Sequence, residues 1–184
     1  MNTHSITIEQ YSWRESDVGF AAYVPATETS LKELVGIIHL GIRNTNSNQE
    51  VPPYVNVFWL LVKKQAGNPQ LSKYQRVGKR LMQVAIEYSF ENLCQGRVQL
   101  LSYADAVPFY YSLHMRCEDE DTDLLVTEAM KNAKGKKIDI AKQMFVGELM
   151  YLPEAAVAIW QANIIKKPIL ERTKEAAERA LQAA

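Results

Sequence analysis

The pattern of apolar and polar positions before residue 65 predicts a series of strands. Apolar and polar residues alternate over residues 4–12, which predicts a half-buried strand, and residues 20–24 predict a second strand. The segments 34–42 and 54–63 are apolar at most positions, which favours strands inside a sheet over strands at its edge. The polar run 43–50 between them predicts a loop.

A helical period replaces this pattern from Val77 onward. Four apolar residues share one helical face: Val77, Leu81, Val84 and Tyr88. Four polar residues share the opposite face, which we expect to be solvated: Lys79, Gln83, Glu87 and Glu91. We expect the helix to end near Cys94, with Gly96 as a left-handed cap.

The segment after this helix predicts a further strand and helix. Residues 97–103 fit a strand, Asp105 is placed to cap the following helix, and Pro108 is tolerated in its first turn. Because two strands joined through a helix usually pair in parallel, we expect residues 54–63 to pair with residues 97–103.

The last third of the chain is predicted to be mostly helical. Residues 122–134 predict a helix, residues 144–151 a strand, and the region beyond them two helices separated by Pro168. The fold class is therefore α/β or mixed α+β, with a central twisted sheet flanked by helices. We expect a domain over residues 1–152 and a C-terminal helical extension, residues 153–184, which packs back on the domain or on a second copy as a homodimer.

Charge and cysteine content narrow the candidate functions. The chain has 21 Lys and Arg against 21 Asp and Glu, so we expect no nucleic-acid partner and no attraction to anionic lipid. It has no signal-peptide pattern and no run of roughly 20 apolar residues, so we expect a cytoplasmic protein without a membrane partner. Cys94 and Cys117 are predicted to be reduced, buried thiols. The three histidines are scattered, so we predict no metal site.

The stretch from Val55 to Met82 contains the first candidate site. It predicts an apolar strand, a polar loop and the start of an amphipathic helix. The first backbone N–H groups of a helix have no partner within the helix, and they favour an anion such as a phosphate. The sequence therefore predicts a phosphate-binding loop here.

Two ordered sequence blocks sharpen this interpretation. Leu60-Leu61-Val62 is followed by Gln75-Arg76-Val77-Gly78-Lys79-Arg80, and a second block runs Tyr103-x-x-Ala106-x-x-Phe109-Tyr110-x-x-Leu113-His114-Met115. Together they resemble the GNAT superfamily of N-acetyltransferases. In that family a Leu-x-Val-like run leads to Gln/Arg-x-x-Gly-x-Gly/Ala, and the next strand leads to a pattern close to Asn-x-x-Ala-x-x-Phe-Tyr-x-x-Leu-Gly-Phe. The resemblance covers residues 4–152.

This resemblance implies an N-acyltransferase that moves an acetyl group from acetyl-CoA to an amine of a small molecule or protein by direct attack. The CoA pyrophosphate would lie on the backbone amides from Gln75 to Arg80, with Gly78 allowing a close approach. The pantetheine arm would pair with the strand from Leu60 to Val62. Tyr110 would protonate the departing CoA thiolate.

The chain departs from the family pattern at three places, the last of them a pair of residues. Arg80 stands where the family has Gly or Ala, and Tyr103 replaces Asn. His114-Met115 replaces Gly-Phe, so we expect a different turn there. These departures give a second hypothesis, a non-catalytic domain that binds acyl-CoA or a partner for regulation or assembly.

Several roles stay open at this point. Tyr103 and Tyr111 compete with Tyr110 for the role of acid. Three residues are candidate general bases: Glu50, His39 and Glu148. The acidic run 118–123 either attracts a cationic amine or forms a solvated turn. Trp13 and Trp59 are interpreted as core or sheet-face residues rather than substrate platforms.

Overall fold

A seven-stranded sheet forms the centre of the molecule. The structure is a computed structural model, and it describes residues 6–14, 17–44, 52–65, 68–72, 76–132 and 147–182. The sheet contains β1 (Thr7–Arg14), β2 (Asp17–Val24), β3 (Glu33–Arg43), β4 (Tyr54–Val62), β7 (Val98–Ser102), β8 (Arg116–Cys117) and β9 (Glu148–Tyr151). Its strand order is β1-β2-β3-β4-β7-β9-β8. Only β4 and β7 pair in parallel, and the other neighbours are antiparallel. The predicted parallel pair and the mixed α+β class are confirmed.

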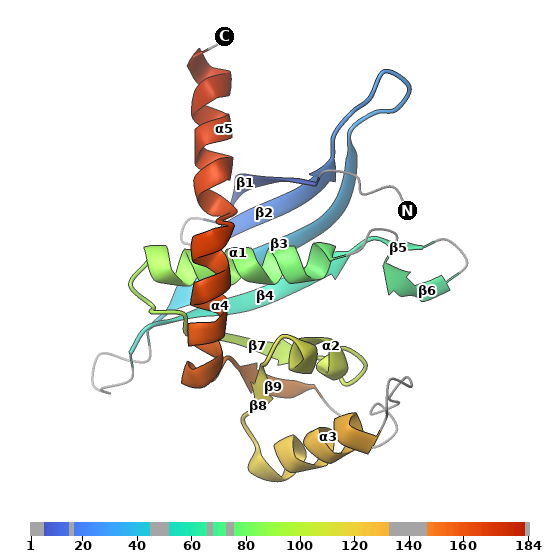
Figure 1. Cartoon of the computed structure of the whole chain (residues 1–184), viewed down its shortest axis with the longest axis vertical. Coiled ribbons are helices and arrows are strands. Elements are labelled where there is room, and N and C mark those ends of the chain that lie inside the picture. Colours follow the sequence, from blue (N-terminus) through green and yellow to red (C-terminus); the bar gives the residue numbers. More distant parts are fainter. Residues whose placement is uncertain are drawn as a thin grey trace.

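The described helices are α1 (Val77–Glu91), α2 (Val107–Ser112), α3 (Glu120–Asn132), α4 (Glu154–Lys166) and α5 (Leu170–Gln182). The helix α1 packs on one face of the sheet, in contact with β2, β3, β4 and β7. In Figure 1, α1 crosses the sheet, α4 crosses α1, and α5 continues past the sheet. Fully buried residues of the strands and of α1 form the core between these layers: Phe20, Ile38, Leu40, Leu81 and Met82.

The side chains that alternate with the core residues along the strands point to the opposite face, which we call the open face. Trp59, Leu61 and Leu101 lie there and are 50%, 56% and 70% exposed. The sheet therefore has one face packed under helices and one that presents large apolar side chains to solvent.

A missing side chain lets α1 lie close to the sheet. A Cβ at Gly36 on β3 would lie 2.7 Å from Cγ1 of Val77 and 3.0 Å from Cδ1 of Leu81. Gly36 therefore allows the first turn of α1 to rest directly on β3. This contact fixes the position of the helix start relative to β4, the neighbouring strand.

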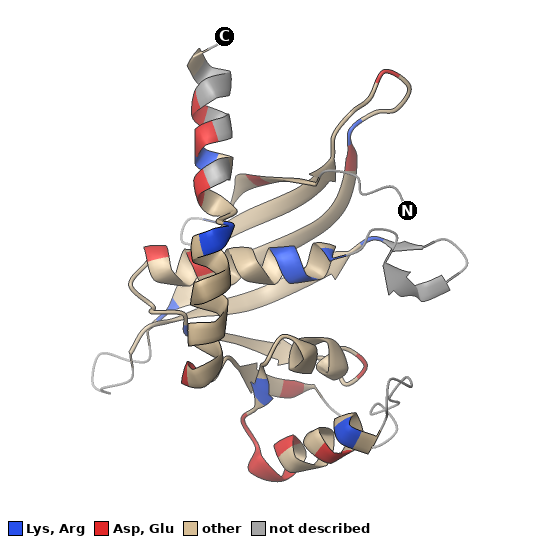
Figure 2. Ribbon diagram, viewed as in Figure 1, with Lys and Arg blue, Asp and Glu red and all other residues tan. Residues whose placement is uncertain are grey.

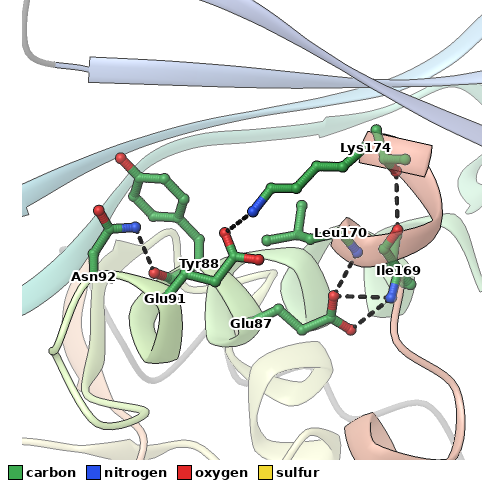
Figure 3. Close-up of polar contacts among 8 residues, drawn as sticks. Glu87, Tyr88, Glu91, Asn92, Ile169, Leu170 and Lys174 are labelled. Atoms are coloured by element: carbon green, nitrogen blue, oxygen red, sulfur yellow. Dashed lines mark hydrogen bonds and ion pairs between the residues drawn. The ribbon is translucent and has the colours of Figure 1, made fainter. Parts of the chain in front are cut away.

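Glu87 is buried, although the sequence predicts it on a solvated face. Its carboxylate is 5% exposed and accepts hydrogen bonds from the N–H groups of Ile169, at 2.9 and 3.0 Å, and Leu170, at 2.7 Å (Figure 3). Gln83 donates to the Lys167 carbonyl at 2.8 Å and to Glu87 at 2.7 Å. The prediction of a solvated face was wrong here because the start of α5 packs on it.

The C-terminal helices pack back on the domain. The indole N–H of Trp160 on α4 donates to the Leu113 carbonyl at 3.0 Å, and this ring is buried. Lys174 on α5 forms a 2.9 Å ion pair with Glu91 on α1. How residues 1–152 and 153–184 divide into folding units stays a prediction.

Other local predictions differ from the structure at their boundaries. The residue before α2 is Ala106 and no side chain caps the helix, so the predicted cap by Asp105 is wrong. The helix α1 ends at Glu91, before Gly96, which has a φ of +83°. Two further strands were not predicted in the polar loop, β5 (Lys64–Gln65) and β6 (Asn68–Ser72), which pair with each other. Cys94 and Cys117 are free and buried, as predicted.

Candidate functional site

The strands β4 and β7 separate at their carboxyl ends. They pair only from Val55 to Val57 and from Val98 to Leu100. Beyond these residues β4 continues along β3 and β7 continues along β9. A bulge places Phe58 outside the β3–β4 register, and bulges bend and twist a strand. The bulge thus coincides with the point where β4 leaves β7, which we call the β4–β7 divergence.

The last residues of β4 present backbone groups toward this divergence. The N–H of Lys63 donates to the Val35 carbonyl on β3 at 2.8 Å. Because successive residues of a strand direct their backbone groups to alternate sides, those of Leu60 and Val62 point away from β3. Among the described residues no strand pairs with this edge of β4. It can therefore pair with an extended ligand, as a strand edge pairs with a peptide.

The helix α1 starts beside the end of β4 without a cap of its own. Arg76 precedes the helix with φ of +65°, and no side chain caps the helix start. The first helical hydrogen bond joins the Arg80 N–H to the Arg76 carbonyl at 2.9 Å. The N–H groups of Val77, Gly78 and Lys79 therefore have no partner within the helix, and the first turn contains no acidic residue. Gln75 lies outside the described residues.

Gly78 joins the two sequence blocks in space. A Cβ at this position would lie 2.9 Å from Cζ of Phe109 and 3.6 Å from Cγ2 of Val62. The end of β4, the start of α1 and the helix α2 therefore meet here. The close approach at Gly78 is made by an aromatic ring of the chain itself. The predicted approach of a phosphate to the same residue stays a prediction.

The basic side chains of this turn lie in different surroundings. The ammonium group of Lys79 lies 5.6 Å from the centroid of the Trp160 ring on α4, which is a cation–π distance. Arg80 is half-buried, and Arg76 is exposed. Lys79 is therefore directed toward α4, while its backbone N–H belongs to the uncapped turn.

Tyr110 lies on α2 next to the residue that contacts Gly78. Its ring packs edge-on against Phe109, with centroids 5.0 Å apart, and the side chain is buried. Burial raises the pKa of Tyr110 to about 12. Within the described part of the chain no hydrogen bond is made by its hydroxyl. The phenol thus keeps its proton at neutral pH and has a free hydrogen-bonding position.

Tyr111 has a structural role instead. Its hydroxyl lies 2.6 Å from a carboxylate oxygen of Asp123 and 2.6 Å from the Thr127 hydroxyl, both on α3. Burial, followed by the hydrogen bond to Asp123, raises the pKa of Tyr111 to about 12. Tyr103, the other competitor, is 73% exposed beyond the end of β7. Of the three tyrosines, only Tyr110 is both buried and unbonded.

Two of the three candidate bases are described. Glu148 pairs with Ser102 at the end of β7, and burial, followed by the charge of Asp119, raises the pKa of its carboxyl. His39 is on β3 and lies opposite Trp59 of β4. Burial, followed by the charge of Arg14, lowers its pKa. Both therefore lie near the β4–β7 divergence, whereas Glu50 falls outside the described residues.

His39 is held by aromatic residues of β1. Its Nε2 lies 2.5 Å from the Tyr11 hydroxyl, and its ring stacks on Trp13 at a centroid distance of 4.0 Å. Its Nδ1 is buried without a hydrogen-bond partner in the described residues. These contacts place the imidazole on the open face, away from α1.

The turn after α2 has the backbone of a glycine turn. His114 has a φ of +68°, in the left-handed region that favours glycine. That the turn differs from the Gly-Phe turn of the family stays a prediction. A histidine at this φ carries backbone strain that a glycine would not.

The acidic run 118–123 starts α3 (Figure 2). A carboxylate oxygen of Asp119 accepts the Thr122 N–H at 2.8 Å. Asp123 accepts the Cys117 N–H at 2.9 Å as well as the Tyr111 hydroxyl. These two acids thus have structural partners at a helix start.

The described residues hold neither a metal-binding cluster nor a membrane-spanning helix. In them, no group of three or more His, Cys, Asp or Glu side chains is arranged to hold a metal ion. No helix there has both the length and the apolar character required to cross a membrane.

The comparisons with known proteins identify the fold. No family model and no curated protein matches the sequence. The crystal structure of the KacTA–DNA complex contains a chain with a TM-score of 0.55 and 12% identity, covering 86% of this chain and 99% of that one. A mutant of the AtaT toxin, bound to the C-terminus of the antitoxin AtaR and to acetyl-CoA, has a TM-score of 0.48 and 12% identity, covering 78% and 71%. By its likeness to the KacTA chain, the present fold is GNAT-like, a mostly antiparallel mixed α+β sheet flanked by helices.

Proposed function

We propose that the protein is an acetyl-CoA-dependent N-acyltransferase. The observation that supports this most is the β4–β7 divergence beside the uncapped start of α1. There Val62 and Gly78 of the first motif block lie next to Phe109 of the second. A strand edge and a helix start at one place fit a ligand that is extended at one end and anionic at the other.

Each part of the ligand has a counterpart in this arrangement. The backbone groups of Leu60 and Val62 would pair with the amides of the pantetheine arm. The N–H groups of the first turn of α1 would bind the pyrophosphate, assisted by the positive end of the helix dipole. The Arg80 side chain either turns away from the phosphates, as one sequence alternative has it, or would be a further phosphate partner. Its backbone N–H already donates to the Arg76 carbonyl, so the amides left for the phosphates are those before it.

The reaction is a direct transfer between a thioester and an amine. The lone pair of the acceptor nitrogen attacks the carbonyl carbon, a C–N bond forms, and the C–S bond breaks with its electron pair left on sulfur. Tyr110 would give its proton to that sulfur and regain one from solvent. The proton lost by the nitrogen goes to water or to a base, for which His39 and Glu148 are the described candidates.

Burial of Tyr110 affects this step in two ways. Because burial raises its pKa to about 12, the phenol carries its proton throughout the neutral range. The same shift makes Tyr110 a weaker acid than an ordinary tyrosine, so donation of its proton is less favourable. The transfer therefore depends on negative charge that develops on sulfur as the C–S bond breaks.

The departures from the family pattern at Arg80, Tyr103 and His114, together with the weaker acidity of Tyr110, favour a second candidate function. A chain with the same acyl-CoA site but a poor acid would bind acyl-CoA for regulation or assembly without turnover. The two functions share the ligand and differ in whether CoA is released.

A titration and a release assay separate these functions. Acetyl-CoA at 100 times its Kd is expected to add about 2.7 kcal/mol of stability, measured as a rise in Tm. Absence of a shift with acetyl-CoA and with longer acyl-CoAs would reject both functions. A shift without CoA release over a panel of primary amines would support the non-catalytic one.

Substitution of Tyr110 tests the assigned acid. We expect Tyr110→Phe to lower kcat by about 100-fold and to leave the acetyl-CoA Kd nearly unchanged, because the hydroxyl acts on the leaving group. Tyr111→Phe is the matched control: it loses hydrogen bonds to α3 and should lower stability while keeping kcat of the folded enzyme. An unchanged kcat in Tyr110→Phe would rule out this role.

The partners of this chain follow from the proposed reaction. We propose a small molecule or a protein as the amine acceptor, acting in the cytoplasm. The KacTA structure is a complex with DNA, so the comparison does not support the expectation that nucleic acid is excluded. That expectation stays a prediction from the balanced charge, and a gel-shift titration of duplex DNA at physiological salt tests it.

A further inference from the structure

The open face of the sheet has two parts that differ in how their apolar side chains are covered. Over β1 to β4, three aromatic rings each lie beneath a cation. Arg14 covers Trp13 at 4.4 Å. Lys32 covers Tyr23 at 4.1 Å, and Arg43 covers Phe58 at 4.5 Å. In a cation–π contact of this kind the cation covers one face of the ring, shields it from water and is attracted to it. These three rings therefore have cationic partners within the chain.

The part around the β4–β7 divergence lacks such cover. Four large apolar side chains lie there, two on β4 and one on each of β7 and β9, and we call them the rim: Trp59, Leu61, Leu101 and Leu149. Their exposed fractions are 50%, 56%, 70% and 37% in that order. Among the described residues no cation lies over the Trp59 ring. Exposed apolar side chains gathered at one place mark a surface that something else covers.

The geometry places the rim opposite the proposed cofactor site. The start of α1, where the phosphates would bind, contacts the helix-covered face through Gly36 and Val77. Trp59 lies opposite His39 on the other face, and Leu101 alternates with the buried Leu100 and Ser102. A thioester reaching the divergence from the helix-covered face leaves the open face to its reaction partner.

We propose that the acceptor amine carries an apolar group, aromatic or branched aliphatic, which packs on the rim while its nitrogen enters the β4–β7 divergence. This rests on the proposed acyl transfer, since the rim borders the point where the thioester would lie. Trp59 and Leu101 are then specificity-determining residues on the two sides of the divergence. The sequence interpretation of Trp59 as a core or sheet-face residue would be incomplete, because its exposed half would form part of the acceptor site.

Two primary amines that differ only in the apolar group test this proposal. The full chain is assayed with acetyl-CoA and either 2-phenylethylamine or ethylamine. We expect kcat/KM for phenylethylamine to be at least tenfold higher. Trp59→Ala and Leu101→Ser should each reduce that preference about fivefold or more, mainly by lowering kcat/KM for phenylethylamine. Both side chains are half or more exposed, so these changes create no buried cavity.

A matched control is Leu31→Ser, a leucine that is 91% exposed between β2 and β3. It should change neither the rates nor the preference. Turnover with equal rates on the two amines would overturn the acceptor proposal and leave the acyltransferase intact. If CoA is not released, calorimetric binding of the two amines decides: preferential binding of phenylethylamine that Trp59→Ala weakens supports the rim, and equal or absent binding overturns it.

A second copy of the chain is the competing occupant of the rim, and the oligomeric state tests it. If Trp59→Ala converts a dimer into a monomer in light scattering without changing amine affinity, the rim is a contact between two copies, and the acceptor proposal is wrong.

Discussion

Two helix starts in this molecule are treated in opposite ways. At α5, the N–H groups of Ile169 and Leu170 donate to the buried carboxylate of Glu87, which the chain supplies from another helix (Figure 3). At α1, no side chain caps the start, and Arg76 lies in the left-handed region before it. A carboxylate of the same chain thus neutralises the positive end of α5. The positive end of α1 has no such group and is available to an anionic ligand.

The distribution of acidic residues follows the same division. The first turns of α3, α4 and α5 each contain at least one acid: Glu120, Asp121 and Asp123, then Glu154, then Glu171. The first turns of α1 and α2, the two helices beside the β4–β7 divergence, contain none. Acids at a helix start stabilise it by about 0.3 to 1 kcal/mol each, so their absence at these two starts costs stability. A site that binds an anionic ligand benefits from that absence, because no carboxylate repels the ligand.

The largest predicted effect comes from removing the carboxylate at the start of α5. Glu87→Ala removes the acceptor of two buried N–H groups and of the Gln83 amide, so we expect a loss on the order of 3 kcal/mol in the free energy of unfolding, measured in urea. Glu87→Gln keeps one acceptor oxygen and should lose less.

The control for this variant is Glu91→Ala, one helical turn further along α1. Its ion pair with Lys174 joins side chains that are 37% and 58% exposed, and such surface pairs contribute at most about 1 kcal/mol. Equal losses in the two variants would show that the buried carboxylate is no more important than a surface ion pair, and the comparison of the two helix starts would fail.

The sequence predicts the elements around the β4–β7 divergence better than it predicts the start of α5. Local patterns identify most strands of the sheet, α1 and the parallel β4–β7 pair, because alternation and helical period are local properties, whereas the short strands β5, β6 and β8 are missed. The proximity of Val62, Gly78 and Phe109 is a finding of the structure. Glu87 is placed wrongly by the same reasoning, because its spacing on α1 is that of a solvated position. Its burial depends on Ile169 and Leu170, more than 80 residues later in the chain.

Two features of the site also could not be predicted from local pattern. The sequence around Phe58 continues an ordinary strand, and the bulge there becomes visible only in its register against β3. Tyr110 and Tyr111 are adjacent on one short helix, and only the position of α3 shows that Asp123 binds the second. In both cases the deciding contact comes from another element of the fold.

An intermediate effect is expected from filling the start of α1 with an acid. Lys79→Glu places a carboxylate in its first turn, which should stabilise the helix by up to about 1 kcal/mol. The same charge should repel the CoA pyrophosphate and weaken acetyl-CoA binding about tenfold, which is about 1.4 kcal/mol. Opposite signs for stability and affinity, from thermal unfolding and calorimetry on one variant, are the signature of an anion site.

Lys79→Gln is the matched control, because it also loses the contact with Trp160 but adds no charge. We expect it to change affinity by much less than Lys79→Glu. If both variants lose affinity equally, the Lys79 ammonium itself binds the ligand. If neither does, the phosphates do not lie at the start of α1, and the contrast with α5 has no functional meaning.

The smallest predicted effect separates the roles of backbone and side chain at the turn before α1, with the turn after α2 as a comparison. Arg76 and His114 both have left-handed φ values, +65° and +68°, which cost a non-glycine residue about 1 kcal/mol. Arg76→Gly and His114→Gly should therefore each raise the free energy of unfolding by about 0.5 to 1 kcal/mol. If backbone amides hold the pyrophosphate, neither change alters the acetyl-CoA Kd by more than about twofold. A tenfold loss of acetyl-CoA affinity in Arg76→Gly alone would assign the phosphate contact to the exposed guanidinium. A side chain, and not the backbone amides at the start of α1, would then bind the phosphates.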